Sequence, residues 1–427
     1  MNKKVTTVAM MALAMALASC STTKKVENSQ EKNTMDHVVV SGSDDPMDEG
    51  YLILTDAQRK IVGNNNAFAL NLFKEVSGFD SRVVSPMSVS YLMGMLANGA
   101  DGQTREEIMN AIGCKGVSLQ ELNEFYKLML AKSGNFDKQV TISIANYIAL
   151  NKQYSLKKPF ADIMKSDYQA GVESLDFGSP ATTQKINGWC DKQTHGMIPS
   201  IIDQVEADAV SYIMNAIYFN GTWTDKFDKS ETKLERFQGY TRDIKKTQMM
   251  HRNGKYMFTD NAMFSAVSIP YGSGTYQMTV LLPNRDKSID ELLKSLDADK
   301  LSKLRYDMDD CVVDLKLPRF STELDLPLND IISKLGAPTM FTGGADFHNF
   351  ADGNLFISKM FQKAKIEVSE EGTKAAAVTA AIMTMSALRP EEPRHVEFHA
   401  DRPFVYMITE SSTGAILFMG QFTGSEL

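Results

Sequence analysis

Hydrophobic residues in the first half of the chain recur with the period of a helix. One periodic segment runs from Thr55 to Gly78, and another follows Ser85-Pro86 and runs to Gly99, with Ser85 as its expected N-cap. A Ser or Thr three residues before a Glu predicts a capping box. This spacing marks helix starts at Thr104, Ser118 and Ser288.

Runs rich in Val, Ile, Phe, Tyr and Met, separated by turn residues, predict strands and dominate the second half. The expected strands cover residues 140–150, 172–177, 212–219, 247–258, 264–270, 276–282, 312–317, 355–368, 396–398, 404–408 and 416–422. Helices come first and do not alternate with the strands. This order predicts an α+β fold with large antiparallel or mixed sheets.

The N-terminus has the layout of a secretion signal, with Lys3 and Lys4 before an apolar run that is too short to span a bilayer comfortably. The run ends in Leu-Ala-Ser-Cys, which resembles the bacterial lipobox. That resemblance implies cleavage before Cys20 and attachment of lipid to it. The alternative is a plain signal peptide with an incidental cysteine.

The polar segment that follows indicates a tether. We therefore predict a signal peptide at 1–19, a lipid-anchored tether at 20–54 and one domain at 55–427. The protein is then expected in a bacterial cell envelope, attached to the membrane through its lipid. Ser21 after the cysteine favours the outer membrane by resemblance to bacterial sorting rules, and the face of that membrane stays open.

Charge and cysteine usage exclude several kinds of function. A net charge of -8 and a pI near 5.4 argue against a nucleic-acid partner, because phosphate binding needs a basic face. Cys114, Cys190 and Cys311 are widely spaced and odd in number. They are interpreted as small buried residues and not as a disulfide framework or a zinc site. No cofactor is implied.

No local signature of an enzyme occurs along the chain, so no catalytic residue is assigned. His395, Glu397 and His399 would share one face of a strand and are the best metal candidate. A solvated strand face is the preferred interpretation of this pattern, and no metal is assigned. A triad assembled across the fold stays open, because its members need not be neighbours in sequence.

Several motifs in order identify a family resemblance. They are Ser85-Pro86-Met87-Ser88 followed by GADGQT, SLDF at 174–177, INGWCDKQTHGMI from Ile186, NAIYFNGTW at 215–223, EEGTKAAA at 370–377 and FHADRPF at 398–404. From about Thr55 onward the chain resembles the serpins. The resemblance implies about eight to nine helices around three β-sheets, an exposed reactive-centre loop and a monomer.

The stretch EEGTKAAAVTA resembles the hinge of that loop. The matching residues are Glu370, Glu371, Gly372, Thr373, Lys374, Ala375, Ala376 and Ala377. In inhibitory serpins a protease cleaves the loop, which then inserts as a new strand of the main sheet, a behaviour that is a standard example of strand addition. Alternate residues must enter a close-packed interior, so they must be small and uncharged. Here the inward set would be residues 373, 375, 377, 379, 381 and 383, and none is charged.

The resemblance places the scissile bond seventeen residues into the loop, which is Ser386 when Glu370 is counted first. We expect cleavage at Ser386-Ala387, with Met385-Ser386 second and Thr384-Met385 third. Small and apolar residues there suggest elastase-like or subtilisin-like targets. Arg389 would be a cleavage site for trypsin-like enzymes, but it lies three residues after Ser386.

Five further residues match regions that control the sheet. Ser85, Ser88 and Asn215 match the shutter under the opening point of the sheet, where the resemblance implies that Asn215 joins the two serines by hydrogen bonds. Gln362 stands where many serpins carry a histidine. An amide can still donate and accept hydrogen bonds there. Trp223 would cap the sheet where the hinge enters. Ordinary helix capping by Ser85 and a plain core tryptophan are the alternatives.

The resemblance therefore implies an irreversible inhibitor of serine proteases, and by the same chemistry of cysteine proteases. The alternative is a non-inhibitory protein of the same fold that is cleaved as a substrate or binds a partner.

Overall fold

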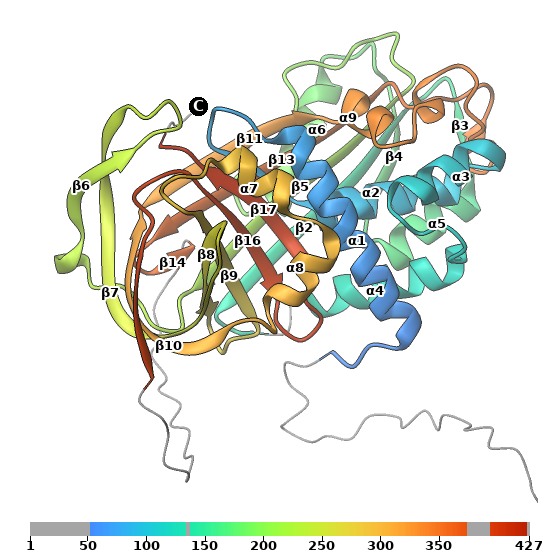
Figure 1. Ribbon diagram of the computed structural model, residues 1–427. Helices are drawn as coiled ribbons and strands as arrows, with labels where there is room; N and C mark the ends of the chain where they lie inside the picture. The colour runs from blue at the N-terminus through green and yellow to red at the C-terminus, as the bar shows by residue number, and fades with distance from the viewer. Residues whose placement is uncertain (1–51, 134–136, 374–392, 425–427) are drawn as a thin grey trace, which may run out of the picture. The chain divides into compact units, whose positions relative to one another are not determined.

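The computed structural model describes residues 52–133, 137–373 and 393–424 (Figure 1). Over these residues the chain folds into nine α-helices and three β-sheets, so the predicted α+β class is confirmed. Figure 1 shows α1 to α5 gathered on one side and the strands β6 and β7 on the other. No helix in the described ranges is long and apolar enough to cross a membrane.

The helices of the described residues are mostly short. They are α1 (Asp56–Val76), α2 (Pro86–Gly99), α3 (Gly102–Ala111), α4 (Leu119–Ser133), α5 (Lys158–Asp167), α6 (Ala181–Gln193), α7 (Ile289–Ser295), α8 (Ala298–Leu304) and α9 (Asn329–Lys334). Two 3-10 turns, η2 (Lys229–Glu231) and η3 (Thr339–Phe341), complete the helical elements of this part.

Three of the four predicted helix starts at hydroxyl caps are confirmed. The Ser85 hydroxyl accepts from Ser88 N before α2, and Ser118 and Ser288 form capping boxes with the glutamates three residues on. The cap at Thr104 is wrong. Asp101 caps α3 instead, and Thr104 Oγ1 accepts from the backbone of Asp346 at 2.9 Å.

The six-stranded sheet has strand order β11-β13-β14-β5-β2-β4. Its members are β11 (Phe320–Pro327), β13 (Lys359–Ser369), β14 (Gly372–Thr373), β5 (Ser211–Thr222), β2 (Val140–Asn151) and β4 (Gly171–Leu175). β13 and β5 run parallel to each other, while β11 is antiparallel to β13 and β2 is antiparallel to β5.

The nine-stranded sheet has strand order β1-β17-β16-β9-β8-β7-β10-β15, with β6 paired to β7. Its strands are β1 (Arg82–Val84), β17 (Ile416–Phe422), β16 (Phe404–Glu410), β9 (Tyr276–Pro283), β8 (Phe264–Tyr271), β7 (Ile244–Asp260), β10 (Asp309–Pro318), β15 (Arg394–His399) and β6 (Lys233–Gln238). β3 (Ser155–Leu156) and β12 (Ala351–Asp352) form the third, two-stranded sheet.

Helix α2 forms the centre of the core. Its residues are buried along nearly the whole helix, and it packs against β5 and β2 of the six-stranded sheet and against β17 of the nine-stranded sheet. A helix that is apolar on all sides is stable only when it is enclosed in this way. Its N-cap, Ser85, therefore lies between the two large sheets and not at the surface.

Every predicted strand is present, but two details were wrong or missed. Residues 355–358 are not part of a strand, because β13 begins at Lys359, and the buried side chains of Leu355 and Ile357 explain the apolar pattern there. β11 was not predicted, although its side chains alternate strictly between buried and exposed. The three cysteines of the described residues are buried and unpaired, as interpreted.

Two histidines join three adjacent strands through one carboxylate. His251 Nε2 on β7 lies 2.6 Å from Asp314 Oδ1, and His399 Nε2 on β15 lies 3.1 Å from Asp314 Oδ2. Asp314 is on β10, the strand between them. His399 thus has its hydrogen-bond partner on the neighbouring strand β10.

We predict that Asp314→Asn destabilises the protein in a pH-dependent way. Burial opposes ionisation, but hydrogen bonds from His251 and His399 outweigh it and lower the pKa of Asp314. A carboxyl with a lowered folded-state pKa stabilises above its ordinary value near 4 and loses that contribution as the pH falls through the lower value. Thermal unfolding at pH 7 should show a loss of about 1 kcal/mol, because the site is partly exposed.

The loss should shrink as the pH approaches 3. Asp309→Asn, at the exposed start of the same strand, is the matched control and should change little. An equal loss for Asp314→Asn at pH 7 and near pH 3 would contradict this account of the pH dependence.

Candidate functional site

The first residues of the predicted reactive loop form a strand between two others. β14 is antiparallel to both neighbours, with Thr373 opposite Val368 of β13 and Gly221 of β5. Beyond it, β13 and β5 pair directly with each other through residues 359–365 and 212–218. We call the boundary between β13 and β5 the seam. The seam is open at one end, where β14 occupies it, and closed along the rest.

Thr373 is completely buried in this opening. Its hydroxyl lies 2.8 Å from the Tyr271 hydroxyl, and the Tyr271 ring stacks on Trp223 with ring centroids 4.3 Å apart. A small side chain with one hydroxyl fits here because its only polar group has a partner. A charged side chain at this position would be buried without a counterion.

At Gly372 the backbone enters the sheet at a point that has no room for a side chain. Its φ of 135° is a conformation that L-residues rarely adopt, and a Cβ would lie 2.2 Å from the carbonyl oxygen of Gly221. The chain therefore needs glycine here to bring its backbone between the strands.

Glu370 fixes the start of the hinge with a buried carboxylate. Its side chain accepts from the Thr232 hydroxyl at 2.7 Å and from two guanidinium nitrogens of Arg319, with Arg319 Nε at 3.2 Å from Oε2. Burial opposes ionisation, but these hydrogen bonds outweigh it and lower the pKa of Glu370. The ionised form is thus held in place by paired donors, which is the condition under which a buried charge is tolerated.

Glu371 lies on the outer side of the same turn and makes ion pairs with Lys226 at 2.8 Å and Lys229 at 3.2 Å. Hydrogen bonds from these two lysines lower the pKa of its carboxyl. Because the carboxylate and Lys229 are partly solvated, these pairs contribute less than the contacts of Glu370.

Trp223 covers the point where the hinge enters. Its indole Nε1 donates to the carbonyl of Ser369 at 2.8 Å, and its backbone N donates to the carbonyl of Glu371 at 3.0 Å. Trp223 as a whole is 1% exposed. The tryptophan therefore contacts the turn on both sides of Glu370 and is more than a residue of the general core.

The four shutter residues are buried together at mid-seam, with Gln362 at the centre. Its Oε1 accepts from Ser85 N at 2.8 Å, and its Nε2 donates to Ser85 O at 2.9 Å and to Asn215 Oδ1 at 3.0 Å. Asn215 in turn donates to Asn146 Oδ1 at 2.9 Å. One amide thus joins α2, β13 and β5, as the donor and acceptor capacity of a glutamine allows.

This arrangement corrects one detail of the sequence analysis. Asn215 was expected to bond Ser85 and Ser88 directly, but Gln362 stands between Asn215 and Ser85. The Ser85 hydroxyl donates to Leu417 O at 2.7 Å, and the buried Ser88 hydroxyl has no hydrogen-bond partner among the described residues. The direct bond is absent because the longer amide side chain of Gln362 reaches both partners.

Part of the predicted site lies outside the described residues. This part comprises Lys374, Ala375, Ala376 and Ala377 of the hinge, the cleavage candidates Thr384, Met385, Ser386, Ala387 and Arg389, and the lipidation residue Cys20. Their assignments stay predictions.

The structure also adds partners that sequence reasoning missed. Arg319 and Thr232 on Glu370, Tyr271 on Thr373, and Asn146 on Asn215 all come from distant parts of the chain. No local motif marks them. Only a pattern of paired changes among related sequences would have connected them to the hinge and the shutter.

Comparisons with known proteins agree on one family. The family model described as "Serpin (serine protease inhibitor)" matches residues 63–424. The chain is 31% identical to Iripin-2 from Ixodes ricinus, over 87% of this chain and 95% of that protein, and 31% identical to Serpin B3 from Homo sapiens, over 84% and 98%. The native structure of the thermophilic serpin tengpin is similar with a TM-score of 0.78 and 27% identity, covering 88% of this chain and 96% of that one.

We predict that Glu370→Gln loosens the hinge. A neutral amide loses the charge that Arg319 and Thr232 hold, so a loss of about 2 kcal/mol is expected, together with faster amide exchange at Thr373. Because the pKa of Glu370 is lowered, its contribution is present above the ordinary carboxyl value and is lost as the pH falls below it. Thermal unfolding and hydrogen exchange at pH 7 measure both effects.

Glu371→Gln is the matched control, since it removes a carboxylate from the same turn at a partly solvated position. It should cost less than about 0.5 kcal/mol. If the two variants behaved alike, Glu370 would not be the residue that fixes the hinge.

Proposed function

The chain belongs to the serpin family, and from this premise we propose that it inhibits serine proteases by trapping them after loop cleavage. Most of its relatives are protease inhibitors and not enzymes. The observation that carries the proposal is β14: the hinge already lies between β13 and β5, paired with both, before the remainder of the seam opens.

The register of the seam favours insertion of a whole strand. Lys359 lies opposite Tyr212 in the closed part, and the same numerical offset relates Val368 to Gly221 beside β14. β13 and β5 therefore need only separate, without sliding, to admit a strand that continues from Thr373. Each new residue would gain hydrogen bonds to both neighbours.

Continued in this register, the loop sequence fits the interior. Ala375, Ala377, Thr379 and Ala381 would lie opposite the core-facing residues of β13, while Lys374 would face outward beside Glu367. Ile382 would lie opposite Lys359 and Tyr212, where β13 begins. The inserted strand would thus end at residue 382, and Met383, which was counted in the inward set, would fall just beyond the paired region.

The chemistry of trapping would come from the target. A serine protease attacks the scissile carbonyl and forms an ester with the loop, and hydrolysis of that ester needs an intact oxyanion hole. Insertion would pull the attached protease along the seam and distort its active site. A cysteine protease would be trapped through the corresponding thioester. Ser386 remains the preferred attacked residue, with elastase-like or subtilisin-like enzymes as the favoured targets.

The native state must then be kinetically trapped, because the inserted form has more strand pairing than the closed one. Gln362 at mid-seam supports this role, since its bond to Asn215 must break before the strands part. We further propose that Cys20 carries lipid and holds the inhibitor at the envelope of a bacterium, which would place it close to the proteases that attack that surface.

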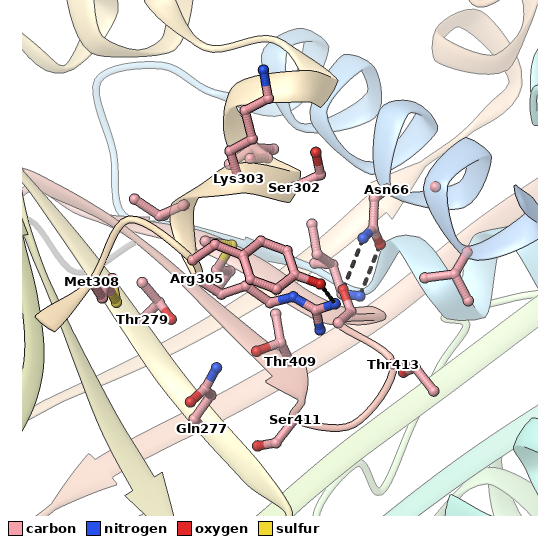
Figure 2. A pocket seen from close by; sticks show the side chains of 18 of the residues that line it. Asn66, Gln277, Thr279, Ser302, Lys303, Arg305, Met308, Thr409, Ser411 and Thr413 are labelled. Atoms are coloured by element: carbon pink, nitrogen blue, oxygen red, sulfur yellow. Dashed lines mark hydrogen bonds between the residues drawn. The ribbon is translucent and has the colours of Figure 1, made fainter. Parts of the chain in front are cut away.

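A second candidate function is the binding of a small organic anion. A cavity of about 250 Å³ lies between α1, α8, β9 and the turn after β16 (Figure 2). Leu304, Met308 and Ile416 supply apolar walls, and Arg305 forms no ion pair within the described residues. The solved structure of human thyroxine-binding globulin complexed with thyroxine is similar to this chain, with a TM-score of 0.77 and 25% identity over 86% of this chain.

We predict that the chain without its first 54 residues forms a complex with at least one serine protease that survives denaturing electrophoresis. The panel should contain elastase-like, subtilisin-like, trypsin-like and papain-like enzymes. The mass of the released C-terminal peptide would identify the scissile bond among residues 384–389. Cleavage without any complex across the panel would favour the substrate-type alternative.

We predict that Thr373→Arg converts the inhibitor into a substrate. The guanidinium would have to enter a site with no counterion, so strand insertion should become slower than hydrolysis of the ester. The fraction of trapped protease should then fall by tenfold or more, an effect of about 1.4 kcal/mol or larger. Lys374→Glu alters the charge at the adjacent outward position and should still trap. Equal trapping by both variants would argue against insertion.

The cavity can be tested separately by titrating the protein with 1-naphthoate in a calorimeter, with the uncharged 1-naphthamide for comparison. Arg305→Gln should weaken naphthoate binding about tenfold, the effect of losing one charge contact of about 1.4 kcal/mol. Arg236→Gln, on β6 and also outside any ion pair in the described residues, is the matched control. Equal binding by both variants would remove this candidate.

A further inference from the structure

One face of the ribbon formed by β6 and β7 is open to solvent and carries no acidic residue. Its six side chains form three cross-strand pairs, Leu234 with Gln248, Arg236 with Lys246 and Gln238 with Ile244. Residues two apart along a strand, and residues paired across antiparallel strands, share a face, so these six lie on the same side. Gln238 is half-buried and the other five are exposed. We call this set of six the outer ribbon face.

The outer ribbon face combines exposed apolar groups with unpaired positive charge. Within the described ranges only six large hydrophobic residues are exposed, and Leu234 at 57% and Ile244 at 58% are two of them. Arg236 and Lys246 lie between these two, opposite each other, and form no ion pair with any described residue. The whole chain has a net charge of -8, so this face is a local reversal of its charge.

The outer ribbon face continues through Gln238 into a small cavity. The cavity has a volume of about 150 Å³ and is bounded by the turn between β6 and β7, the connection from β9 to α7 and the residues before β16. Four of its lining residues are cations and one is an acid, namely Arg242, Arg285, Lys287, Arg402 and Asp290. The lining is therefore predominantly basic.

The cations of this cavity are only partly neutralised. Arg285 and Arg402 share the single carboxylate of Asp401, with contacts of 2.9 Å and 2.8 Å. Lys287 pairs with Asp286 at 3.1 Å, whereas Arg242 is exposed and forms no ion pair within the part of the chain that the structure describes. Positive charge thus remains available at the cavity as well as on the outer ribbon face.

An exposed aromatic ring borders the same cavity. Phe79 is 68% exposed, and its ring lies edge-on to that of Tyr240, a lining residue, with centroids 4.9 Å apart. Phe79, Leu234 and Ile244 are therefore half of the exposed large hydrophobic residues in the described ranges, and all three adjoin unpaired cations. Exposed apolar residues that gather in one region mark an interaction site.

We infer that the outer ribbon face and the adjoining cavity form a docking surface for an anionic lipid membrane. Lipid phosphates would contact Arg236, Lys246 and the cations of the cavity, while the exposed apolar side chains would enter the headgroup region. An acidic protein is repelled by such a membrane unless it presents a local basic face. The lipid proposed on Cys20 would keep the domain within reach of a membrane, and the docking surface would add a second contact.

Docking in this way would turn the reactive loop away from the membrane. β6 begins after Thr232, which bonds Glu370 at the start of the hinge, and β7 ends at Asp260, which pairs with Arg394 where β15 begins. The turn that joins β6 to β7 is at the other end of both strands (Figure 1). Both stems of the loop would thus face the proteases that approach the surface.

The test uses the chain from residue 20 with Cys20→Ser, so that no lipid contributes, and sedimentation with vesicles of equal parts phosphatidylglycerol and phosphatidylcholine. Arg236→Gln with Lys246→Gln should weaken binding about tenfold or more, because each cation near an anionic surface adds attraction. Phe79→Ser with Ile244→Thr should weaken it about fivefold, since less apolar area leaves water. In about 1 M salt the wild-type chain should bind no better than the charge variant.

Lys132→Gln with Lys165→Gln is the matched control, because it removes two exposed lysines without ion pairs from α4 and α5, on the other side of the fold (Figure 1). The control should bind like the wild-type chain. Equal binding by the two charge variants, or equal binding of the wild-type chain to vesicles of phosphatidylcholine alone, would overturn the inference.

A calorimetric titration with glycerol phosphate separates a membrane from a free phosphate ester. Binding of glycerol phosphate without binding to the vesicles would assign the cavity to a small soluble anion and would also overturn the inference. Unchanged thermal unfolding of each variant verifies that it folds. The vesicle assay needs no protease, so a failure of the proposed inhibition would leave its result unchanged.

Discussion

The pairing of β13 with β5 is the constraint on which the rest of the structure depends. Along residues 359–365 the two strands share hydrogen bonds, and beside Thr373 they give those bonds to β14 instead. When a new strand is inserted, the hydrogen bonds between β13 and β5 are replaced by two sets, one between the new strand and each neighbour, which is favourable. Before the new strand arrives, opening the seam only breaks hydrogen bonds and is costly. The closed sheet can hold this free-energy difference because β13 and β5 already have the register that an inserted strand would need.

Two kinds of polar contact act at different places along the seam. At the open end, Glu370 is fixed by Arg319 and Thr232, so the backbone that leads into β14 has a defined start. At mid-seam, Gln362 joins Ser85 to Asn215 in a fully buried setting. Buried hydrogen bonds of this kind are costly to leave unmade, so the bond between Gln362 and Asn215 opposes separation of the strands at mid-seam.

The features that the sequence predicted correctly depend on interactions between residues close together in the chain. The caps at Ser85, Ser118 and Ser288 depend on neighbours three residues away, and they are present. The predicted cap at Thr104 was wrong because Asp101 is an equally good cap and the Thr104 hydroxyl accepts a hydrogen bond from the distant backbone of Asp346. The strand at 320–327 was not predicted, although its residues alternate between apolar and polar. The partners of Glu370 and Thr373 could not be found, because they approach only when the sheets pack.

The polar members of the proposed inward set have a common explanation in the seam. Thr373 already has a hydroxyl partner in Tyr271. In the same register Thr379 would lie opposite Gln362 on one side and Asn215 on the other, the pair whose hydrogen bond must break for the strand to pass. A hydroxyl can donate to one amide oxygen and accept from the other nitrogen, whereas alanine would leave both unsatisfied. The loop would therefore carry its replacement for the shutter bond at the one position where the seam requires it, and alanine at the inward positions between and beyond the two threonines.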